Sequence, residues 1–426
     1  MRASRPGLTH VLTDFGSSTG SVGPGREAFT CTHRTWRRDL IGACASRHPS
    51  LSCPLARLVR AAVFGRENRT VIPTMTHHGV EVTGGVDTHK DTHTAAAIDA
   101  AGRVLGSAQF PATPAGYGRL LAWLHAFGTL VLVGVEGTGA YGAGLARHLH
   151  AAGVAMVEVD RPDRKSRRWQ GKSDPVDAEA AARTALAARR TTVPKRRDGQ
   201  VEALRALRVA RRSAISQRAD AQRQMKALII TAPEPLRAQL RELPDRPLVE
   251  VCAAARPDRA RAGDPAVATR LALRALARRH QQLSAEISEL DALITPLTAT
   301  INPGLCALHG VGPDTAGQLL VTAGENAHRL RSEAAFAMLC AAAPLPASSG
   351  RTNRHRLNRG GDRQANAALY RIVLCRMRWD PRTRAYVERR TKEGLSKKEI
   401  IRCLKRYVAR EVYAALTSTA DPQPAT

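Results

Sequence analysis

Aromatic residues are scarce in this chain of 426 residues, in which Phe, Tyr and Trp together make up only 4%. This scarcity excludes base stacking on aromatic side chains as the main mode of nucleic-acid recognition. No apolar run approaches the roughly 20 residues that a membrane-spanning helix needs, so we expect a soluble protein with no membrane partner. The eight cysteines are scattered and form no Cys-x-x-Cys pair, which indicates neither a zinc site nor a disulfide framework. Reduced thiols in a reducing cytosol are the default expectation.

Acidic residues are few relative to basic ones, with 37 Asp and Glu against 65 Lys and Arg and a formal net charge of +28. Such an excess favours a polyanionic partner. Nucleic acid is the first candidate, ahead of a membrane surface or of basicity without a specific role. Binding should weaken as salt rises, because Lys and Arg side chains release counterions from the phosphates. The length is sufficient for two or three domains.

Residues 1–74 lack the periodic pattern of the rest of the chain. They contain three cysteines and many Ser, Thr, Gly and Arg residues, and no apolar stretch typical of a secretory signal. Patterned sequence begins directly after Met75. We therefore expect residues 1–74 to be a disordered extension or the product of a mis-assigned start, with Met75 rather than Met1 as the natural first residue.

Residues 80–190 have the pattern of an α/β domain. Runs of apolar and β-branched residues between turn residues predict strands, and amphipathic spacing predicts helices. The last helix begins at Pro175, where the missing N–H costs nothing, and Asp174 is placed as its N-cap. The order βββαβαβα matches a ribonuclease-H-like core. The expected strands are Val80–Asp87, Thr92–Asp99, Arg103–Phe110, Leu130–Glu136 and Val154–Val159, and the expected helices are Pro114–Ala126, Gly139–Ala152 and Pro175–Arg189.

Residues 198–300 are predicted to be a helical linker. Gln200–Ile230 has few helix breakers and carries a dense row of arginines. Further along, Leu276, Leu283, Leu290 and Leu297 recur at heptad spacing. Two such helices predict an antiparallel coiled-coil arm, which either dimerises the protein or packs only on itself.

Residues 301–418 are predicted to be a third, all-α domain. The turn Gly310-Val311-Gly312-Pro313 lies between two predicted helices and is typical of a helix-hairpin-helix. In that motif, backbone N–H groups at Gly310 and Gly312 would bind a DNA phosphate, although an ordinary Gly-rich connector is the alternative. Three more helices are expected over residues 364–378, 382–393 and 397–416, the last with the capping box Ser396-Lys397-Lys398-Glu399.

Four carboxylates stand where a metal site would need them. Asp87 and Glu136 each end an apolar strand, and Asp174 and Asp177 lie three residues apart at the start of a helix. Singly, each has an ordinary role as a cap or a surface residue. Together they can converge on one or two Mg²⁺ ions and leave room for a phosphate. The set therefore predicts a magnesium site for phosphodiester chemistry.

Ser349 is a second candidate for chemistry. It lies in a Pro, Ser and Gly loop directly before a basic run. Fixed positive charge would stabilise the phosphorane that forms when a serine attacks a phosphodiester. The alternative is a serine in a flexible loop that only contacts DNA, because no His and Asp pattern accompanies it. The arginines of this run expected to bind nucleic acid are Arg351, Arg354, Arg356, Arg359 and Arg363.

Three groups of motifs resemble one protein family. The segments around Asp87-Thr88-His89, Glu136-Gly137-Thr138 and Asp174-Pro175-Val176-Asp177 resemble the N-terminal DEDD domain of the insertion-sequence transposases called family one-ten, which has a Holliday-junction-resolvase-like fold. The Gly310–Pro313 turn, the Ser348-Ser349-Gly350 loop and the segment from Asn358 to Asn366 resemble the same family's C-terminal domain. The resemblance covers about residues 80 to 410 and leaves residues 1–74 outside.

The resemblance implies a function and a set of partners. It implies a DNA transposase or site-specific recombinase that binds Mg²⁺ with Asp87, Glu136, Asp174 and Asp177. It also implies that Ser349 is the nucleophile, with Ser348 as the open alternative. Further implications are a structured noncoding guide RNA, a homodimer or homotetramer, and a place in the bacterial cytoplasm at the nucleoid.

Two rival functions remain at this stage. The first is a metal-dependent nuclease or junction resolvase that uses only the carboxylates. The second is a non-catalytic nucleic-acid-binding protein from a decayed element. The presence of all four carboxylates and the serine argues against decay, and the C-terminal half would have no role in a simple nuclease.

Overall fold

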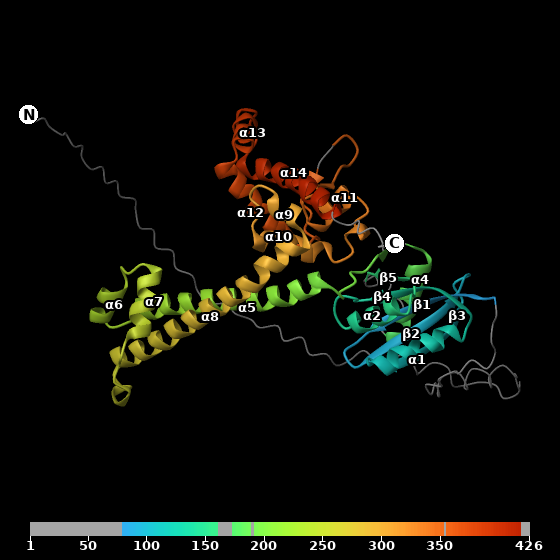
Figure 1. Ribbon diagram of the computed structural model, residues 1–426, viewed down its shortest axis with the longest axis horizontal. Helices are drawn as coiled ribbons and strands as arrows, with labels where there is room; N and C mark the ends of the chain where they lie inside the picture. The colour runs from blue at the N-terminus through green and yellow to red at the C-terminus, as the bar shows by residue number, and fades with distance from the viewer. Residues whose placement is uncertain (1–78, 161–172, 189–190, 353–354, 419–426) are drawn as a thin grey trace, which may run out of the picture. The chain divides into compact units, whose positions relative to one another are not determined.

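The computed structural model describes residues 79–160, 173–188, 191–352 and 355–418. The predictions made for residues 1–74, for Met75 and for Arg354 lie outside these residues. Figure 1 shows an α/β part, a pair of long helices and a cluster of shorter helices, in chain order.

The α/β part is built on a mixed six-stranded sheet with the order β3-β2-β1-β4-β5-β6. The pairs β1–β4 and β4–β5 are parallel, whereas β1–β2, β2–β3 and β5–β6 are antiparallel. All five predicted strands are present, and only the two-residue β6 was not predicted. The strands are β1 (Glu81–Thr88), β2 (Thr92–Asp99), β3 (Val104–Pro111), β4 (Thr129–Glu136), β5 (Met156–Val159) and β6 (Thr191–Thr192).

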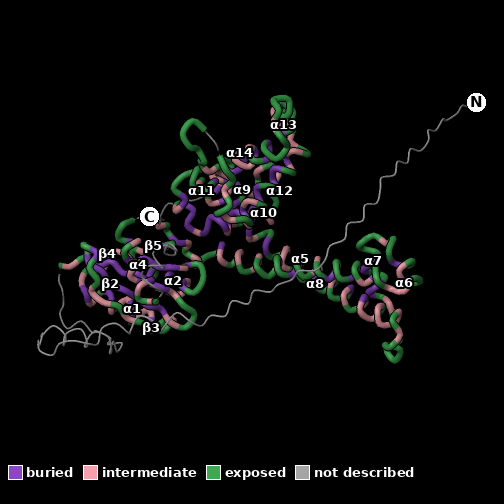
Figure 2. The backbone as a smooth tube through the Cα atoms, turned by 180° about the vertical axis from the view of Figure 1, so that it is seen from behind, coloured by how far each residue is buried: buried purple, intermediate pink, exposed green. Residues whose placement is uncertain are grey.

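Among the described residues, three helices pack on this sheet. The leucines of α1 (Pro114–His125) and α2 (Ala143–Ala151) share a core with Val82, Val86, Val133 and Val135 of β1 and β4. The third helix, α4 (Asp174–Leu186), contacts the sheet through alanines. Figure 2 shows the buried backbone concentrated in these strands and along the inner sides of the helices.

The largest error in a helix boundary in this part is at the start of α2, and the predicted end of α4 was also late, because that helix ends at Leu186 and not at Arg189. The helix expected from Gly139 begins only at Ala143, because the preceding residues form a turn. In that turn the N–H groups of Ala140 and Gly142 both donate to the carbonyl oxygen of Gly137, which has a φ of +71°. Gly137 thus reverses the chain directly after Glu136 and delays the helix.

The two long helices α5 (Gln200–Ile230) and α8 (Pro265–Ile301) pack along each other in opposite directions. Arg211 near the start of α5 pairs with Asp291 near the end of α8, and Arg218 donates to Ser284. Between them, α6 (Glu234–Leu240) and α7 (Asp245–Ala254) share a core with the far ends of the pair. The antiparallel packing is confirmed, while a coiled-coil geometry and a role in dimerisation stay predictions.

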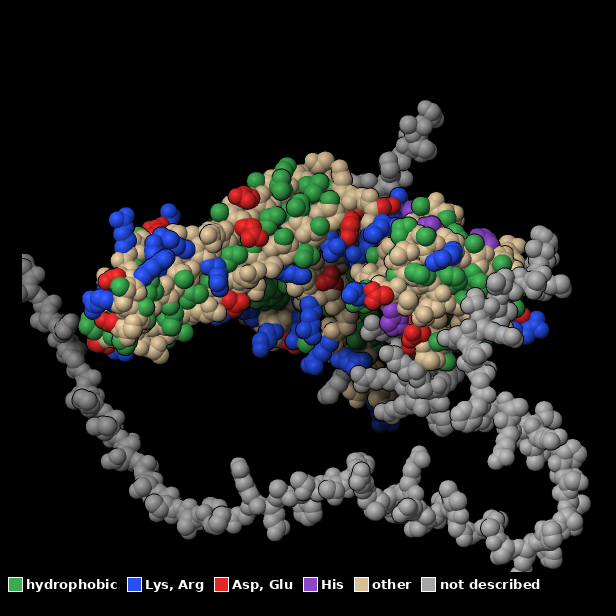
Figure 3. Space-filling model, turned by 90° about the horizontal axis from the view of Figure 1, so that it is seen from below, with side chains coloured by type: hydrophobic (Ala, Val, Ile, Leu, Met, Phe, Trp, Pro, Cys, Tyr) green, Lys and Arg blue, Asp and Glu red, His purple; other side chains and the backbone are tan. Residues whose placement is uncertain are grey.

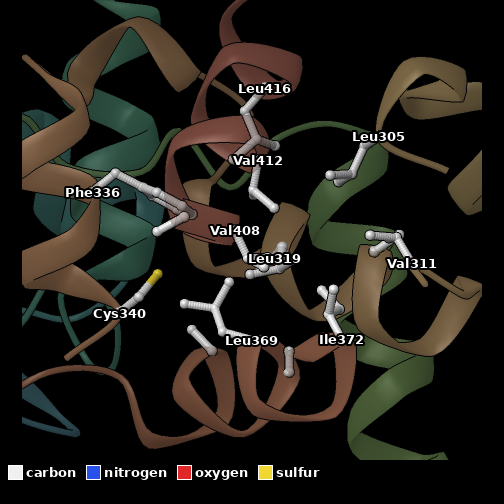
Figure 4. Packing of buried hydrophobic residues seen from close by; sticks show 14 of the residues in the cluster. Leu305, Val311, Leu319, Phe336, Cys340, Leu369, Ile372, Val408, Val412 and Leu416 are labelled. Carbon is white, nitrogen blue, oxygen red and sulfur yellow. The ribbon is translucent and has the colours of Figure 1, made fainter. Parts of the chain in front are cut away.

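The third part is a cluster of helices around one large core. Figure 4 shows Phe336, Leu369, Ile372, Val408 and Val412 packed against one another. The predicted capping box is confirmed: the Ser396 N–H donates to Glu399 Oε2 at 2.9 Å, and the Glu399 N–H donates to Ser396 Oγ at 3.4 Å. The elements are α9 (Pro303–Ala307), α10 (Pro313–Ala323), α11 (Glu333–Leu339), β7 (Leu345–Pro346), β8 (His355–Arg356), α12 (Arg363–Trp379), α13 (Pro381–Lys392) and α14 (Lys397–Ser418).

Within the described ranges, no helix is both long and apolar enough to cross a lipid bilayer. The described cysteines are free thiols. Burial raises the pKa of Cys340 in the helical core to about 12, with a smaller contribution from Asp362.

Candidate functional site

The first two carboxylates are brought together by neighbouring parallel strands. Asp87 lies one residue before the end of β1, and Glu136 is the last residue of β4. The register pairs Val86 with Val135, so both carboxyl ends lie at the same edge of the sheet. The hydroxyl of Thr88 donates to the carbonyl oxygen of Glu136 at 2.8 Å and ties the two strand ends together. Both acidic residues are buried.

Helix α4 reaches this edge because the two strands beneath it have glycines facing each other. Gly85 of β1 is paired with Gly134 of β4. A β-carbon on Gly85 would overlap the backbone of Ala178 and Ala182, and one on Gly134 would lie 2.7 Å from the carbonyl oxygen of Ala181. The helix backbone therefore rests directly on the strands, at a distance that any side chain would prevent.

The first turn of α4 carries the other two carboxylates. Asp177 is buried and Asp174 is partly exposed. The prediction that Asp174 is the N-cap was wrong: Ser173 holds that position in extended backbone, and Asp174 is already helical. The carboxylate of Asp174 lies beside the imidazole of His89 instead, with Oδ1 4.0 Å from Nε2. This placement brings the pair from α4 to the strand ends, as the i, i+3 spacing predicted.

His89 is a site residue that the sequence argument did not assign. Its Nδ1 lies 3.6 Å from Asp87 Oδ2, so the imidazole bridges Asp87 and Asp174. One ligand-type atom from each of these three residues lies within 4.8 Å of the others. One feature of the sequence could have indicated His89. It lies two residues after an aspartate at the end of a strand, where the chain turns back at the edge of the sheet.

The pKa of Asp87 responds to the charges of the other three carboxylates. Burial raises its pKa above the ordinary value, and the nearby charges of Glu136, Asp177 and Asp174 raise it further, while His89 acts in the opposite direction. Buried carboxylates that repel one another are costly unless a cation neutralises them. Oxygen donors suit Mg²⁺, Ca²⁺ and Mn²⁺, and an imidazole also suits transition metals. The donor set therefore fits a divalent cation.

Ser349 lies on a different element. It is exposed at the tip of the β7–β8 hairpin, where its backbone N–H donates to the Thr352 carbonyl oxygen at 3.1 Å. The Thr352 N–H returns a bond of 3.0 Å, and Gly350 adopts a φ of +54°. Ser348 beside it is also exposed. No interaction between described residues joins Ser349 to the four carboxylates, so the structure does not bring the two predicted sites together.

The residues expected to bind nucleic acid are exposed where the structure describes them, apart from Gly310. Gly310 has a φ of +77°, and a β-carbon there would lie 3.4 Å from the carbonyl oxygen of Ile372 on α12. Gly312 is the N-cap of α10 and has open space around it. In the view of Figure 3, basic side chains are interspersed with acidic ones. The exposed arginines of the basic run are Arg351, Arg356, Arg359 and Arg363.

Comparison with known proteins finds two matching family models. Residues 84–231 match a model described as "Transposase", built on the DEDD domain of IS110 elements. Residues 303–388 match a model described as "Transposase IS116/IS110/IS902 family". The chain is also 33% identical over 117 residues to the "Insertion element IS110 uncharacterized 43.6 kDa protein" of Streptomyces coelicolor. That match spans 27% of this chain and 28% of the relative.

Proposed function

The chain belongs to the IS110 family of transposases, and from this premise we propose that it cuts and rejoins DNA as the transposase of an insertion sequence. The observation that carries the proposal is the meeting of Asp87, Glu136, Asp174 and Asp177 at one edge of the sheet, inside the segment matched by the DEDD model. The strand order supports a ribonuclease-H-like core over residues 80–190. A helical linker over 198–300 and a transposase domain over 301–418 complete the proposed division.

In this proposal the four carboxylates bind Mg²⁺. The bound ion would supply positive charge that activates an attacking oxygen and stabilises a leaving one. Asp87, Glu136 and Asp177 would be the buried donors, and Asp174 would be the more exposed one. Thr88 and the glycine pair hold these donors in position through the backbone.

Ser349 is the proposed nucleophile in the other half of the chain. Its Oγ would form a bond to a DNA phosphorus as the bond from phosphorus to one strand oxygen breaks, and that oxygen would leave with a proton. The exposed arginines of the basic run would stabilise the charge that develops on the phosphate. Exposure at a hairpin tip supports this role, because a large substrate can reach the hydroxyl there.

The remaining partners follow from the family. We propose that DNA of the element ends and of the target is the substrate, that a structured noncoding RNA guides the choice of target, and that the protein works as a homodimer or homotetramer. The turn at Gly310 and Gly312 is proposed as a helix-hairpin-helix contact to DNA phosphates, and the antiparallel helices as a coiled-coil arm. We propose the bacterial nucleoid as its place of action, because its proposed substrate is DNA.

A carboxylate-only nuclease or junction resolvase is the second candidate. It is favoured by the observation that the carboxylate cluster is complete without any described contact to Ser349. Such an enzyme would cleave DNA by water attack and would need no hairpin serine.

The two candidates differ in whether protein becomes joined to DNA. With element-end DNA, the flanking noncoding RNA and Mg²⁺, we expect denatured samples of the wild-type protein to contain a covalent protein–DNA adduct. Chelation of the metal with EDTA should remove the adduct, and so should Ser349→Ala, whereas Ser348→Ala should keep it. Cleaved DNA without an adduct, unaffected by Ser349→Ala, would establish the nuclease instead.

His89 gives a prediction for metal choice. Because an imidazole nitrogen is a better donor for Mn²⁺ or Co²⁺ than for Mg²⁺, we expect His89→Ala to weaken Mn²⁺ binding by about tenfold and Mg²⁺ binding much less. Calorimetric titration of each ion measures this without any DNA. His125→Ala, at an exposed position on α1, is the matched control. Equal losses for both ions would mean that His89 does not select between them as a metal ligand.

A further inference from the structure

A cavity of about 540 Å³ lies in the helical part, away from the carboxylate cluster. Its walls come from the loop after β8, the start of α12 and one side of α14. We call it the basic pocket. Its volume falls in the usual range for ligand sites and is sufficient for one phosphate with its sugar. The polar side chains that line it are Asn358, Arg359, Arg363, Asn366, Arg402 and Lys405.

The pocket lining concentrates positive charge and contains no carboxylate, and among the described residues the carboxyl group that responds to the charge of Arg402 is that of Glu399, outside the lining. Four of its lining side chains are cationic and none is acidic. Among the ion pairs formed between described residues, none includes any of these four cations, whereas the adjacent Arg406 on α14 pairs with Glu333. Arg359, Arg363 and Arg402 are exposed, whereas Lys405 is partly buried. A partly buried cation beside three further cations, without a carboxylate as its own partner, indicates an anionic ligand.

Lys405 is the most enclosed of the four cations. Its Nζ donates to Asn366 Oδ1 at 3.0 Å, a neutral acceptor that leaves the positive charge uncompensated. Burial lowers the pKa of Lys405, and the nearby charge of Arg402 lowers it further. A bound anion would raise the pKa of Lys405 again, because it would supply the counter-charge that the protein itself does not.

The pocket is held in shape by bonds to the end of α11. The side-chain amide of Asn366 donates to the carbonyl oxygens of Cys340 and Ala341 at 2.9 and 3.0 Å. Asn358 donates to the Met338 carbonyl oxygen at 3.0 Å. A β-carbon on Gly361 would lie 2.5 Å from the Ala341 nitrogen, so only glycine allows this approach. These bonds fix Asn366, which in turn positions Lys405, before any ligand arrives.

We propose that the basic pocket binds a backbone phosphate of the DNA strand on which the serine hairpin acts. Its lining includes Leu357, the residue directly after β8, so the pocket lies at the base of the hairpin whose tip carries Ser349. Arg402 and Lys405 from α14 bind the phosphate, and Arg359 and Arg363 enclose it from the loop side. The choice of DNA rests on the function proposed above.

The test measures binding of a fluorescein-labelled, mixed-sequence DNA duplex to the full chain across a salt series in EDTA. For Arg402→Gln with Lys405→Gln, we expect affinity to fall about tenfold or more at moderate salt. The slope of log Kd against log salt should fall by about 1 to 2, the loss expected for one or two phosphate contacts. Arg384→Gln, an exposed arginine on α13, should keep the wild-type affinity and slope.

Two further measurements separate a lost phosphate contact from a lost fold and DNA from RNA. Lys405→Arg keeps the positive charge and should retain most of the DNA affinity. If the double variant lost affinity because position 405 tolerates no substitution, Lys405→Arg would lose affinity as well. An RNA duplex of the same sequence should lose no more affinity than the DNA duplex does. An unchanged salt slope in the double variant, or a loss confined to the RNA duplex, would overturn the proposal. The assay contains no metal and no chemistry, so an absent protein–DNA adduct in the wild type would refute the proposed function without affecting this measurement.

Discussion

Asp87→Asn is expected to abolish metal-dependent strand cleavage, with a loss of about 1,000-fold or more, while making the metal-free protein more stable. Asn has nearly the same shape as Asp but lacks the charge that binds a divalent cation and that repels Glu136, Asp174 and Asp177. Removing a buried, repelled charge should raise the free energy of unfolding in EDTA by about 1 kcal/mol. Removing a metal ligand should cost several kcal/mol of transition-state stabilisation.

The two effects can be measured separately. In the wild type, Mg²⁺ at about a hundred times its Kd should stabilise the fold by roughly 2.7 kcal/mol, and this gain should disappear in Asp87→Asn. Asp91→Asn is the matched control, because Asp91 is exposed a few residues further along the chain. If Asp87→Asn destabilised the metal-free protein, or if Mg²⁺ still stabilised it fully, the carboxylates would not form the metal site.

Local pattern was sufficient to predict most of the α/β part. β2 has the predicted bounds, and β1, β3 and β4 differ from prediction by one residue at each displaced end. These strands combine alternating or continuous apolar residues with clear turn signals, so local preference and tertiary packing agree. The helix expected from Gly139 failed because positive φ at Gly137 is a property of the turn, which helix periodicity does not report.

The parts that escaped prediction depend on contacts between distant segments. His89 became a site residue only when α4 brought Asp174 to its other ring nitrogen. The sequence pattern also did not indicate that Arg208 and Arg211 in the arginine row of α5 both pair with Asp314 at the start of α10. A count of arginines along one helix contains no information on the carboxylates that another helix places against it.

Gly85→Ala should have a large effect for a single added methyl group. The new β-carbon would overlap the α4 backbone at Ala178 and Ala182, and backbone cannot rotate away as a side chain can. Helix α4 would have to move outward, at a cost of about 3 kcal/mol in the free energy of unfolding. Because the first turn of α4 carries Asp174 and Asp177, the same movement should separate them from Asp87 and Glu136. Metal binding is therefore expected to be lost even where the protein stays folded.

Two other Gly→Ala substitutions serve as controls for this prediction. Gly84→Ala directs its methyl group to the opposite face of β1, where it would meet the movable end of the Leu124 side chain at 3.0 Å, so a smaller loss of stability and normal metal binding are expected. Gly118→Ala lies on α1 with open space around it and should stabilise the protein by about 0.5 to 1 kcal/mol. Chemical denaturation with and without Mg²⁺ gives both quantities for each variant. If folded Gly85→Ala were still fully stabilised by Mg²⁺, the carboxylates would tolerate a displaced α4. The close contact between the helix and the glycine pair would then not set the geometry of the site.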